Sequence, residues 1–472
     1  MNAVFNDLCW LSAREMMRRF AKRELSPVDV LEATLARLQA VDPLLNAVCL
    51  LDEAQGRRLA AESAERWRRG TPLGSLDGVP VAIKDSAHVA GWPLRFGSRA
   101  TAETPSPEDT PGVARLREAG AVFFCKTTSP EFGWKGVTHG PLTGITRNPW
   151  DLSRTPGGSS GGSAALVAAG VVPIATGGDG GGSIRIPAAF SGVFGLKPSY
   201  GLVPNLLGPM GTLAVYGGLS RDVTDSALLL NVLTRPDDRD SFAIPYRSID
   251  YLDGLDSGVA GMRIAWSPDL GFRVSDPAVV AGMQPAIDAL VKAGAEVKSV
   301  SLDLSAAQHA VDVIWGASHA AIVRNFDGAQ LASLDPGLLR LIVAAQDISA
   351  SELQAAYAEM RALGQTMQLF HRDHDLLLTP TVPITAFAAG IDSPDTRRFP
   401  RWLDWTPLTW PFNLTRQPAA SVPCGFVDGL PIGLQIVGPM FSEEKILRAS
   451  RCVERACGSA ARPSLVDRTV PA

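Results

Sequence analysis

Two glycine-rich segments that carry serines dominate the chemistry open to this sequence. Residues 157–163 read GGSSGGS and contain Ser159 and Ser160, and residues 177–183 read GGDGGGS and end at Ser183. Because glycine lets the backbone come close to a bound group, several N–H groups could converge near the Ser183 hydroxyl, as an oxyanion hole requires. The pattern indicates a serine nucleophile beside backbone oxyanion donors.

A lysine at the end of an apolar run could supply the base. Lys84 follows the run VPVAI, which has the texture of a buried strand. Desolvation there would lower the pKa of the amine toward neutrality, and a neutral lysine can activate a hydroxyl. A Ser-His-Asp triad stays open, because its members can lie far apart in sequence, although no histidine lies near the glycine-rich segments in sequence. An anion cradle at GGSSGG is disfavoured, because the G-x-x-x-x-G-K-[ST] form is absent.

Short matches to other enzyme motifs lack the residues that should accompany them. V-A-I-K at 81–84 and H-R-D at 371–373 occur in protein kinases, but no G-x-G-x-x-G loop precedes Lys84 and no D-F-G motif is present. His371 and His374 have helical spacing for two metal ligands without a third, so we expect no metal. The six cysteines include no C-x-x-C pair, and we interpret them as reduced thiols of a cytoplasmic protein.

The elements that must hold these residues follow an α/β pattern. The first quarter of the chain is helical and amphipathic, and from residue 78 short β-branched runs alternate with helical patterns. The glycine-rich stretch itself contains a helical pattern at 163–169 and a strand pattern at 171–175, so it is no linker. Downstream, we expect helices over 277–293, 304–325 and 351–373, and strands over 262–266, 296–300, 375–379, 419–423 and 430–437.

Composition places the chain among globular proteins and excludes some partners. Of 472 residues, 46% are hydrophobic and 19% are charged, with a net charge of −4. Such a balance argues against broad electrostatic binding to nucleic acid or anionic membranes. The longest apolar run, 164–175, is too short to span a bilayer, and the N-terminus lacks signal-peptide features. We expect one domain over 1–472, comprising N-terminal helices (about 1–70), a core (about 75–220) and the remaining sheet with its helices (about 221–472).

The run from 156 to 199, GGSSGGSAALVAAG…GGDGGGSIRIPAAFSGVFGLKPS, resembles the amidase signature of serine hydrolases. GVPVAIKDS, the stretch 126–151, GPMGTLAVYGGLSRDVTDSA and TWPFNLTRQPAASVPCGFVDGLPIGLQIVGP are also similar to that family. The resemblance covers nearly the whole chain and is thinnest between 235 and 400. It implies the amidase signature fold, an α/β architecture in which a central mixed twisted β-sheet is covered on both sides by α-helices.

The resemblance also implies roles for individual residues. Lys84 matches the family's catalytic lysine, Ser159 matches the bridging serine that follows a cis peptide bond, and Ser183 matches the nucleophile. The implied oxyanion donors are the backbone amides of Gly180, Gly181, Gly182 and Ser183, and the implied loop supports are Asp179 and Arg185. Gly178 and Gly180 replace threonines of the common G-T-D-T-G-G-S version, which keeps the backbone donors but loosens the loop. Ser191 stands where many relatives carry cysteine.

These observations predict an amidase that hydrolyses a small carboxamide or anilide, or a carbamate, through a Ser183 acyl-enzyme. Its partner is then a small-molecule amide, with no cofactor, no metal, no direct nucleic-acid contact and no membrane. The candidate pocket walls are Phe132, Trp134, Met210, Trp410 and Phe412. The amphipathic N-terminal helices could serve a homodimer.

Two alternatives stay open. The first is the glutaminase subunit of a tRNA-dependent amidotransferase, which would need a partner protein. Many such subunits carry glutamine where this chain has Ile186, and this weakens the hypothesis. The second is a non-catalytic binding protein on the same fold, against which the intact Lys84, Ser159 and Ser183 argue.

Overall fold

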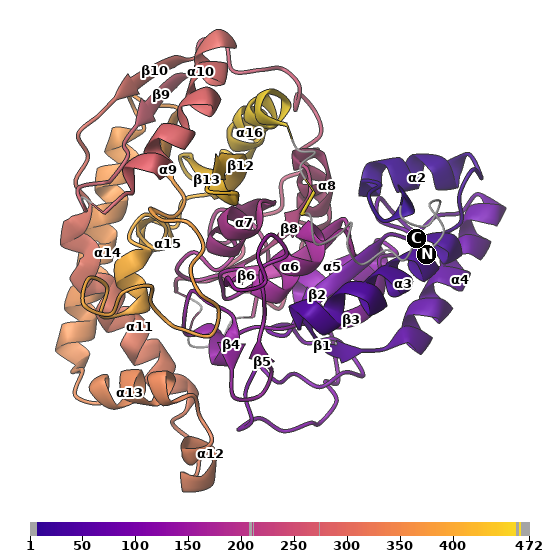
Figure 1. Ribbon diagram of the computed structural model, residues 1–472, viewed down its shortest axis with the longest axis horizontal. Coiled ribbons are helices and arrows are strands. Elements are labelled where there is room, and N and C mark those ends of the chain that lie inside the picture. Colours follow the sequence, from indigo (N-terminus) through magenta and orange to yellow (C-terminus); the bar gives the residue numbers. More distant parts are fainter. Residues whose placement is uncertain (1–6, 207–209, 211, 273, 459–461, 464–472) are drawn as a thin grey trace.

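An eleven-stranded mixed β-sheet runs through the computed structural model, which describes residues 7–206, 210, 212–272, 274–458 and 462–463 (Figure 1). The strands, in spatial order, are β1 (Val48–Leu51), β3 (Val122–Thr127), β2 (Pro80–Lys84), β6 (Ile174–Asp179), β8 (Val215–Ser220), β7 (Phe194–Lys197), β12 (Ala419–Val427), β13 (Leu430–Val437), β11 (Leu376–Pro380), β9 (Arg263–Trp266) and β10 (Glu296–Ser299). Strand β2 pairs in parallel with β3 and β6, whereas β6 pairs antiparallel with β8. The ends of β2 and β6 therefore point the same way, toward the candidate site.

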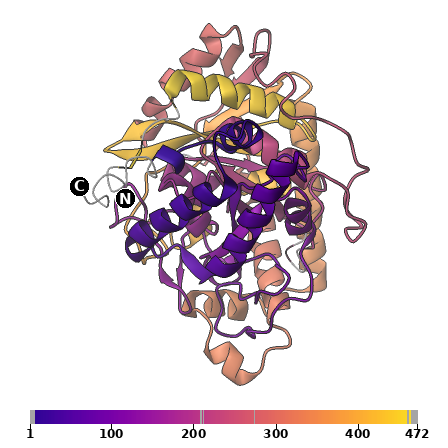
Figure 2. The ribbon, with the colours of Figure 1, turned by 90° about the vertical axis from the view of Figure 1, so that its right-hand side faces the viewer.

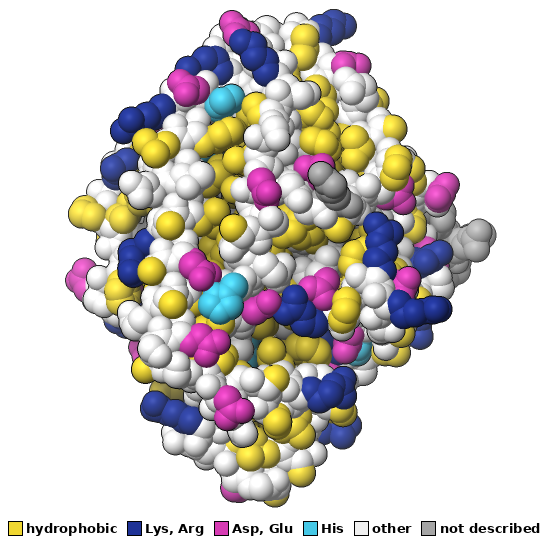
Figure 3. Space-filling model, turned by 90° about the vertical axis from the view of Figure 1, so that its left-hand side faces the viewer, with side chains coloured by type: hydrophobic (Ala, Val, Ile, Leu, Met, Phe, Trp, Pro, Cys, Tyr) yellow, Lys and Arg dark blue, Asp and Glu magenta, His cyan; other side chains and the backbone are white. Residues whose placement is uncertain are grey.

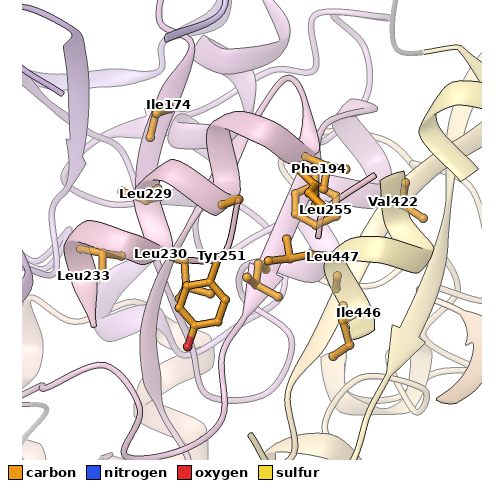
Figure 4. Close-up of a cluster of buried hydrophobic side chains, with 14 of the residues drawn as sticks. Ile174, Phe194, Leu229, Leu230, Leu233, Tyr251, Leu255, Val422, Ile446 and Leu447 are labelled. Atoms are coloured by element: carbon orange, nitrogen blue, oxygen red, sulfur yellow. The ribbon is translucent and has the colours of Figure 1, made fainter. Parts of the chain in front are cut away.

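Helices cover both faces of this sheet, as expected from the sequence. Strand alternation divides the buried side chains between the faces: Val81 and Ile83 belong to one hydrophobic cluster, and Ala82 belongs to another. Figure 4 shows part of the first cluster, where Leu229, Leu230 and Leu447 pack over the sheet. The helices of the first face are α2 (Ala13–Ala21), α5 (Pro111–Glu118), α8 (Val223–Leu233), α9 (Pro277–Gly282), α10 (Gln284–Lys292) and α16 (Glu443–Cys457).

The opposite face carries the helices that surround the site. Helices α3 (Pro27–Leu45), α4 (Glu53–Arg69) and α6 (Gly161–Ala168) pack with the third cluster, and α7 (Arg185–Ser191) lies beside α6. The remaining helices are α11 (Gln308–Ile322), α12 (Gly328–Ala332), α13 (Pro336–Ala344), α14 (Ala350–Phe370) and α15 (Pro411–Leu414). Figures 1 and 2 show α2–α4 gathered at one side of the molecule, whereas α11–α14 lie at the opposite side in Figure 1.

The structure differs from the expected elements in several places, and one of them is strand β1, which falls inside the N-terminal stretch expected to be helical. The helix expected over 277–293 is two helices, because Pro285 at the start of α10 has no N–H to continue the helical ladder. The strand expected over 171–175 is shifted to β6 because Pro173 also lacks this donor, and β6 runs on to Asp179. Helices α12 and α13 had no counterpart in the sequence pattern.

Two further expectations concern the whole chain. The six cysteines all lie in the described part of the structure, and no disulfide joins any of them. In the part of the chain that the structure describes, we find no helix with the length and apolarity needed to cross a membrane. Charges of both signs are scattered among hydrophobic side chains on the face shown in Figure 3, which is the side of α11–α14.

Candidate active site

Lys84 ends β2 and reaches the first glycine-rich segment. Its Nζ lies 2.8 Å from Ser159 Oγ and 3.0 Å from Ser160 Oγ. Its backbone N–H donates to Thr176 Oγ1 of the neighbouring strand at 2.9 Å, which fixes the strand end. The Gly158–Ser159 peptide bond is cis, and Ser159 precedes α6. Strand pairing and this turn thus bring the lysine and both serines into contact.

The environment of Lys84 lowers its proton affinity. The side chain is fully buried, and this desolvation lowers the pKa of the amine from 10.5 to about 7. The carboxylates of Asp179 and Asp85 act in the opposite direction and favour the charged form. At neutral pH a substantial fraction of Lys84 is therefore uncharged and able to accept a proton.

Ser183 lies in the loop that follows β6. Its carbonyl accepts the backbone N–H of Ser160 at 3.1 Å, which ties the two glycine-rich segments together. The side chains of Lys84, Ser159 and Ser183 all line one cavity. Among the described residues, no hydrogen bond is found to Ser183 Oγ, so its hydroxyl has no fixed partner there.

A buried ion pair holds the Ser183 loop in place. Asp179 and Arg185 are both fully buried, and the guanidinium bonds the carboxylate through Nη2 at 2.9 Å and Nε at 3.0 Å. Burial alone would raise the pKa of Asp179, but Arg185 outweighs it and holds this pKa below its usual range. Arg185 also donates to the Thr409 carbonyl and to Gln435 Oε1, so segments distant in sequence fix its position.

One of the expected oxyanion donors, the Gly182 amide, already has an acceptor within its own loop. The Gly182 N–H donates to Asp179 Oδ1 at 2.8 Å and is therefore not free for a substrate. Gly182 has φ +121°, and a methyl group added there would lie 2.4 Å from Thr409 Oγ1, so only glycine fits. The backbone N–H groups of Gly180, Gly181 and Ser183 have no hydrogen-bond acceptor within the described structure. These three remain available to an oxyanion.

The cavity has a volume of about 550 Å³ and a largely apolar wall. Of the five candidate wall residues, the structure places Phe132 and Met210 on the described lining. Trp134, Trp410 and Phe412 are not on it. They are buried in the core, where Trp410 packs edge-on against Phe272 with 5.4 Å between ring centroids. Sequence alone does not distinguish an aromatic residue that fills the core from one that lines a cavity. Here Trp410 and Phe412, at helix α15, are buried in the core.

The rest of the cavity wall comes from residues that sequence reasoning missed. Trp315 and Ile322 belong to α11, and Arg324 follows that helix. All three lie in the stretch where the family resemblance is thinnest, so no motif pointed to them. Phe96, Tyr216 and Leu206 also contribute.

Buried charges anchor the loop that carries Phe132. Glu131 accepts the backbone N–H of Asp335 at 2.5 Å, at the start of α13. Lys135 Nζ lies 3.0 Å from Asp335 Oδ2 and 2.7 Å from Asp392 Oδ1. Glu131 and Lys135 are almost fully buried. These contacts hold the loop that carries Phe132 against the start of α13.

The described residues contain no group of three or more histidine, cysteine or acidic side chains that could hold a metal ion. His371 and His374 lie just after α14 and do not line the cavity. The one histidine on its described lining, His88, has its Nδ1 2.9 Å from Ser106 Oγ. That nitrogen therefore faces Ser106 rather than Ser183.

Comparisons with known proteins agree on one family. The family model described as Amidase matches residues 29–447. An acylamidase from Rhodococcus erythropolis is 36% identical over 455 residues, covering 94% of this chain and 95% of that protein. A glutamyl-tRNA(Gln) amidotransferase subunit from Chloroflexus aggregans is 36% identical over 478 residues, covering 95% and 97%. A bacterial aryl acylamidase structure of the amidase signature family superposes with a TM-score of 0.90 at 30% identity, covering 98% and 99%.

Proposed function

The chain belongs to the amidase signature family, and on that basis we propose that it hydrolyses a small uncharged carboxamide, anilide or carbamate through a Ser183 acyl-enzyme. One observation carries the proposal. A buried lysine whose pKa is lowered to about 7 lies 2.8 Å from Ser159 Oγ, in the cavity that also holds Ser183. This arrangement provides a base, a relay and a nucleophile without histidine or metal.

The proposed reaction begins with two proton transfers. Neutral Lys84 takes the proton of Ser159, and Ser159 takes the proton of Ser183 as Ser183 Oγ bonds to the amide carbonyl carbon. Ser183 Oγ must turn toward Ser159 for this step, and such hydrogen bonds commonly form only once substrate is bound. The carbonyl oxygen becomes an oxyanion held by the N–H groups of Gly180, Gly181 and Ser183, each worth about 3 kcal/mol.

The second half of the reaction returns the protons. The carbon–nitrogen bond breaks, and Ser159 gives a proton to the leaving nitrogen while Lys84 restores the proton of Ser159. Water then attacks the Ser183 ester, and its proton follows the same relay. The carbon–oxygen bond to Ser183 breaks, the carboxylic acid leaves, and Ser183 regains its proton.

The cavity lining favours an uncharged substrate. Phe132, Met210, Trp315 and Ile322 give it apolar walls, and the one buried carboxylate of the described lining, Asp179, is paired with Arg185. Residues 207–209 and 211, outside the described part, carry no charge in the sequence. Free glutamine would bring an ammonium and a carboxylate group. Arg324 of the described lining could face the carboxylate, but this lining offers no unpaired acid to the ammonium. Burying an unpaired charge is costly, so neutral amides should bind better.

The test is release of ammonia or amine from a panel of aryl amides, aliphatic amides, carbamates and glutamine. Wild type is compared with Ser183→Ala and with Ser191→Ala, a control that removes another buried hydroxyl outside the cavity lining. We expect turnover of neutral amides that is lost only in Ser183→Ala. Turnover that survives in Ser183→Ala would refute the nucleophile, and silence of the wild type across the panel would refute the amidase.

A second candidate is the glutaminase subunit of an amidotransferase, which the similarity to the amidotransferase subunit from Chloroflexus aggregans favours. Against it, Ile186 is fully buried in an apolar cluster, where many such subunits carry glutamine. This candidate predicts glutaminase activity and a co-purifying partner in the native host. A fluorophosphonate probe separates both enzymes from a non-catalytic binding protein, because only an active serine is labelled.

A further inference from the structure

Trp315 of α11 lies beside the glycine backbone that carries the oxyanion donors. A methyl group added to Gly180 would lie 3.4 Å from Cζ3 of Trp315, and one added to Gly181 would lie 3.7 Å from the same atom. These are ordinary van der Waals distances for an added methyl group, so the edge of the indole faces the two glycines across a gap of about one methyl group. Trp315 is 2% exposed, yet it lines the cavity. It is therefore a buried part of the cavity wall beside these two glycines.

The indole is itself held in one orientation. Its Nε1–H donates to the Trp134 carbonyl at 3.2 Å, in the loop that carries Phe132. Its ring meets Trp402 edge-on, with 5.2 Å between centroids, and the His319 ring at 4.8 Å. Trp402 completes the cover, because a methyl group on Gly181 would lie 3.2 Å from its Cη2. A hydrogen bond and two ring contacts leave Trp315 little freedom.

The glycine segment needs such a restraint. Gly180 and Gly181 follow the end of β6. Asn413 Nδ2 donates to the Asp179 carbonyl at 2.9 Å and so orients the peptide that carries the Gly180 N–H. The peptide that carries the Gly181 N–H forms no hydrogen bond within the described structure, and glycine has more accessible backbone conformations than other residues, so this peptide is free to turn its donor away. An oxyanion donor contributes fully only when it is already oriented and shielded from water. A rigid aromatic side chain beside the segment supplies both conditions.

We infer that Trp315 is a positioning residue that keeps the Gly181 amide aimed at the oxyanion and shields it from water. The inference rests on the proposed amide hydrolysis. It adds to that proposal a dependence of transition-state stabilisation on α11, a helix outside the glycine-rich segments. A tryptophan that merely formed a cavity wall would affect substrate and transition state alike.

The experiment compares two affinities in each variant. The first is the inhibition constant of an arylboronic acid, whose tetrahedral adduct on Ser183 places an oxygen at the oxyanion site. The second is the dissociation constant of the matching aryl amide, measured in a Ser183→Ala background. The variants are Trp315→Leu and Trp315→Phe. The control is Trp150→Phe, because Trp150 also donates Nε1–H to a carbonyl and meets an aromatic ring, but does not line the cavity.

We expect Trp315→Leu to weaken the boronate by about 30-fold or more and to lower kcat by about 100-fold, the loss that follows removal of one oxyanion donor. Affinity for the amide should change less than about 5-fold, because the bound amide draws less on these donors than the transition state does. Trp315→Phe should lie between Trp315→Leu and wild type, and Trp150→Phe should match wild type.

Equal weakening of boronate and amide in both Trp315 variants would overturn the inference and leave the proposed amidase intact. A wild type that neither hydrolyses the amide nor binds the boronate would instead overturn the proposed function. Melting curves of each variant identify those that fold. If Trp315→Leu does not, Trp315→Phe alone decides, and an unchanged ratio of the two affinities there refutes the inference.

Discussion

The glycine-rich region at 157–185 and the helical region at 308–344 face the same cavity but are built in opposite ways. In the first, the backbone that carries the groups proposed to react is fixed by hydrogen bonds, by a buried ion pair and by glycines that no other residue could replace, such as Gly182. In the second, Trp315 and Ile322 present apolar surface, and their helices rest on other side chains.

The difference separates two tasks. Proton transfer tolerates little displacement, so its groups are held by directional contacts to a rigid sheet. Selection among neutral amides requires only a cavity of suitable shape, which packing can provide. Substitutions in the first region should therefore change the rate by orders of magnitude, whereas most wall substitutions in the second should change preference. Trp315 is the proposed exception, because it lies beside the first region.

The largest effect is expected from removing the proposed nucleophile or base. Ser183→Ala and Lys84→Ala should each lower kcat by a factor of about 10⁴ or more, because serine and lysine act as one unit. Both proteins should remain folded, since neither change leaves a buried charge unpaired. Kinetics on the best substrate, with melting curves, provide the check. Near wild-type rates in either variant would remove the distinction between the two regions.

Breaking the buried ion pair should damage both stability and rate. Arg185→Met leaves the Asp179 carboxylate buried without its cation, which typically costs about 3–5 kcal/mol. Urea unfolding measures this loss. The double variant Asp179→Asn/Arg185→Met should regain stability without regaining activity, because the Gly182 loop loses its charged acceptor. A double variant that regains both would show that the pair serves the fold alone.

The pH dependence should report on Lys84. Its pKa of about 7 means that protonation removes the base below that pH, so kcat/KM should fall tenfold per unit as pH drops below about 7. Asp85 raises this pKa, so Asp85→Asn should move the acid limb to lower pH. Profiles from about pH 5 to about pH 9 test both statements. An acid limb that stays in place in Asp85→Asn would assign the titration to another group.

Substituting a residue of the cavity wall should change the preference among amides of different size more than it changes the overall rate. Ile322→Ala enlarges the cavity, so relative kcat/KM should shift about 10-fold toward bulkier amides, with less than about 3-fold change for the smallest amide. Ile348→Ala is the matched control, since Ile348 packs on the same cluster without lining the cavity. A loss of rate common to all amides would place this wall residue with the first region.

The smallest effect is expected at Trp410. The indole is fully buried in the core and its Nε1 has no hydrogen-bond partner within the described structure, so Trp410→Phe loses packing alone. Substrate preference should stay within about 2-fold of wild type, and unfolding free energy should fall by about 1–2 kcal/mol. Kinetics on two amides of different size check this, and a changed preference would return Trp410 to the cavity wall.

Local patterns could reach the α/β alternation and the segments carrying Lys84, Ser159 and Ser183, because glycine framing and strand alternation are local properties. The mixed sheet with helices on both faces was implied by the family resemblance. Sequence reasoning could not tell that Gly182 gives its N–H to Asp179, because that depends on the direction of single peptide groups. It also could not choose among aromatic residues: Trp315 was missed and Trp410 was placed in the cavity. Burial there depends on how helices far apart in sequence meet.

The stretch of chain from α11 to α13 bears on how the cavity can change during evolution. The Trp315 and Ile322 parts of the cavity wall come from this one block of chain, and α12 and α13 project at the edge of the molecule (Figure 1). Point changes near Ile322 can alter what the cavity admits while Lys84, Ser159 and Ser183 are inherited unchanged. A lineage built this way can change which molecules enter its cavity through α11 without altering the residues of the glycine-rich segments.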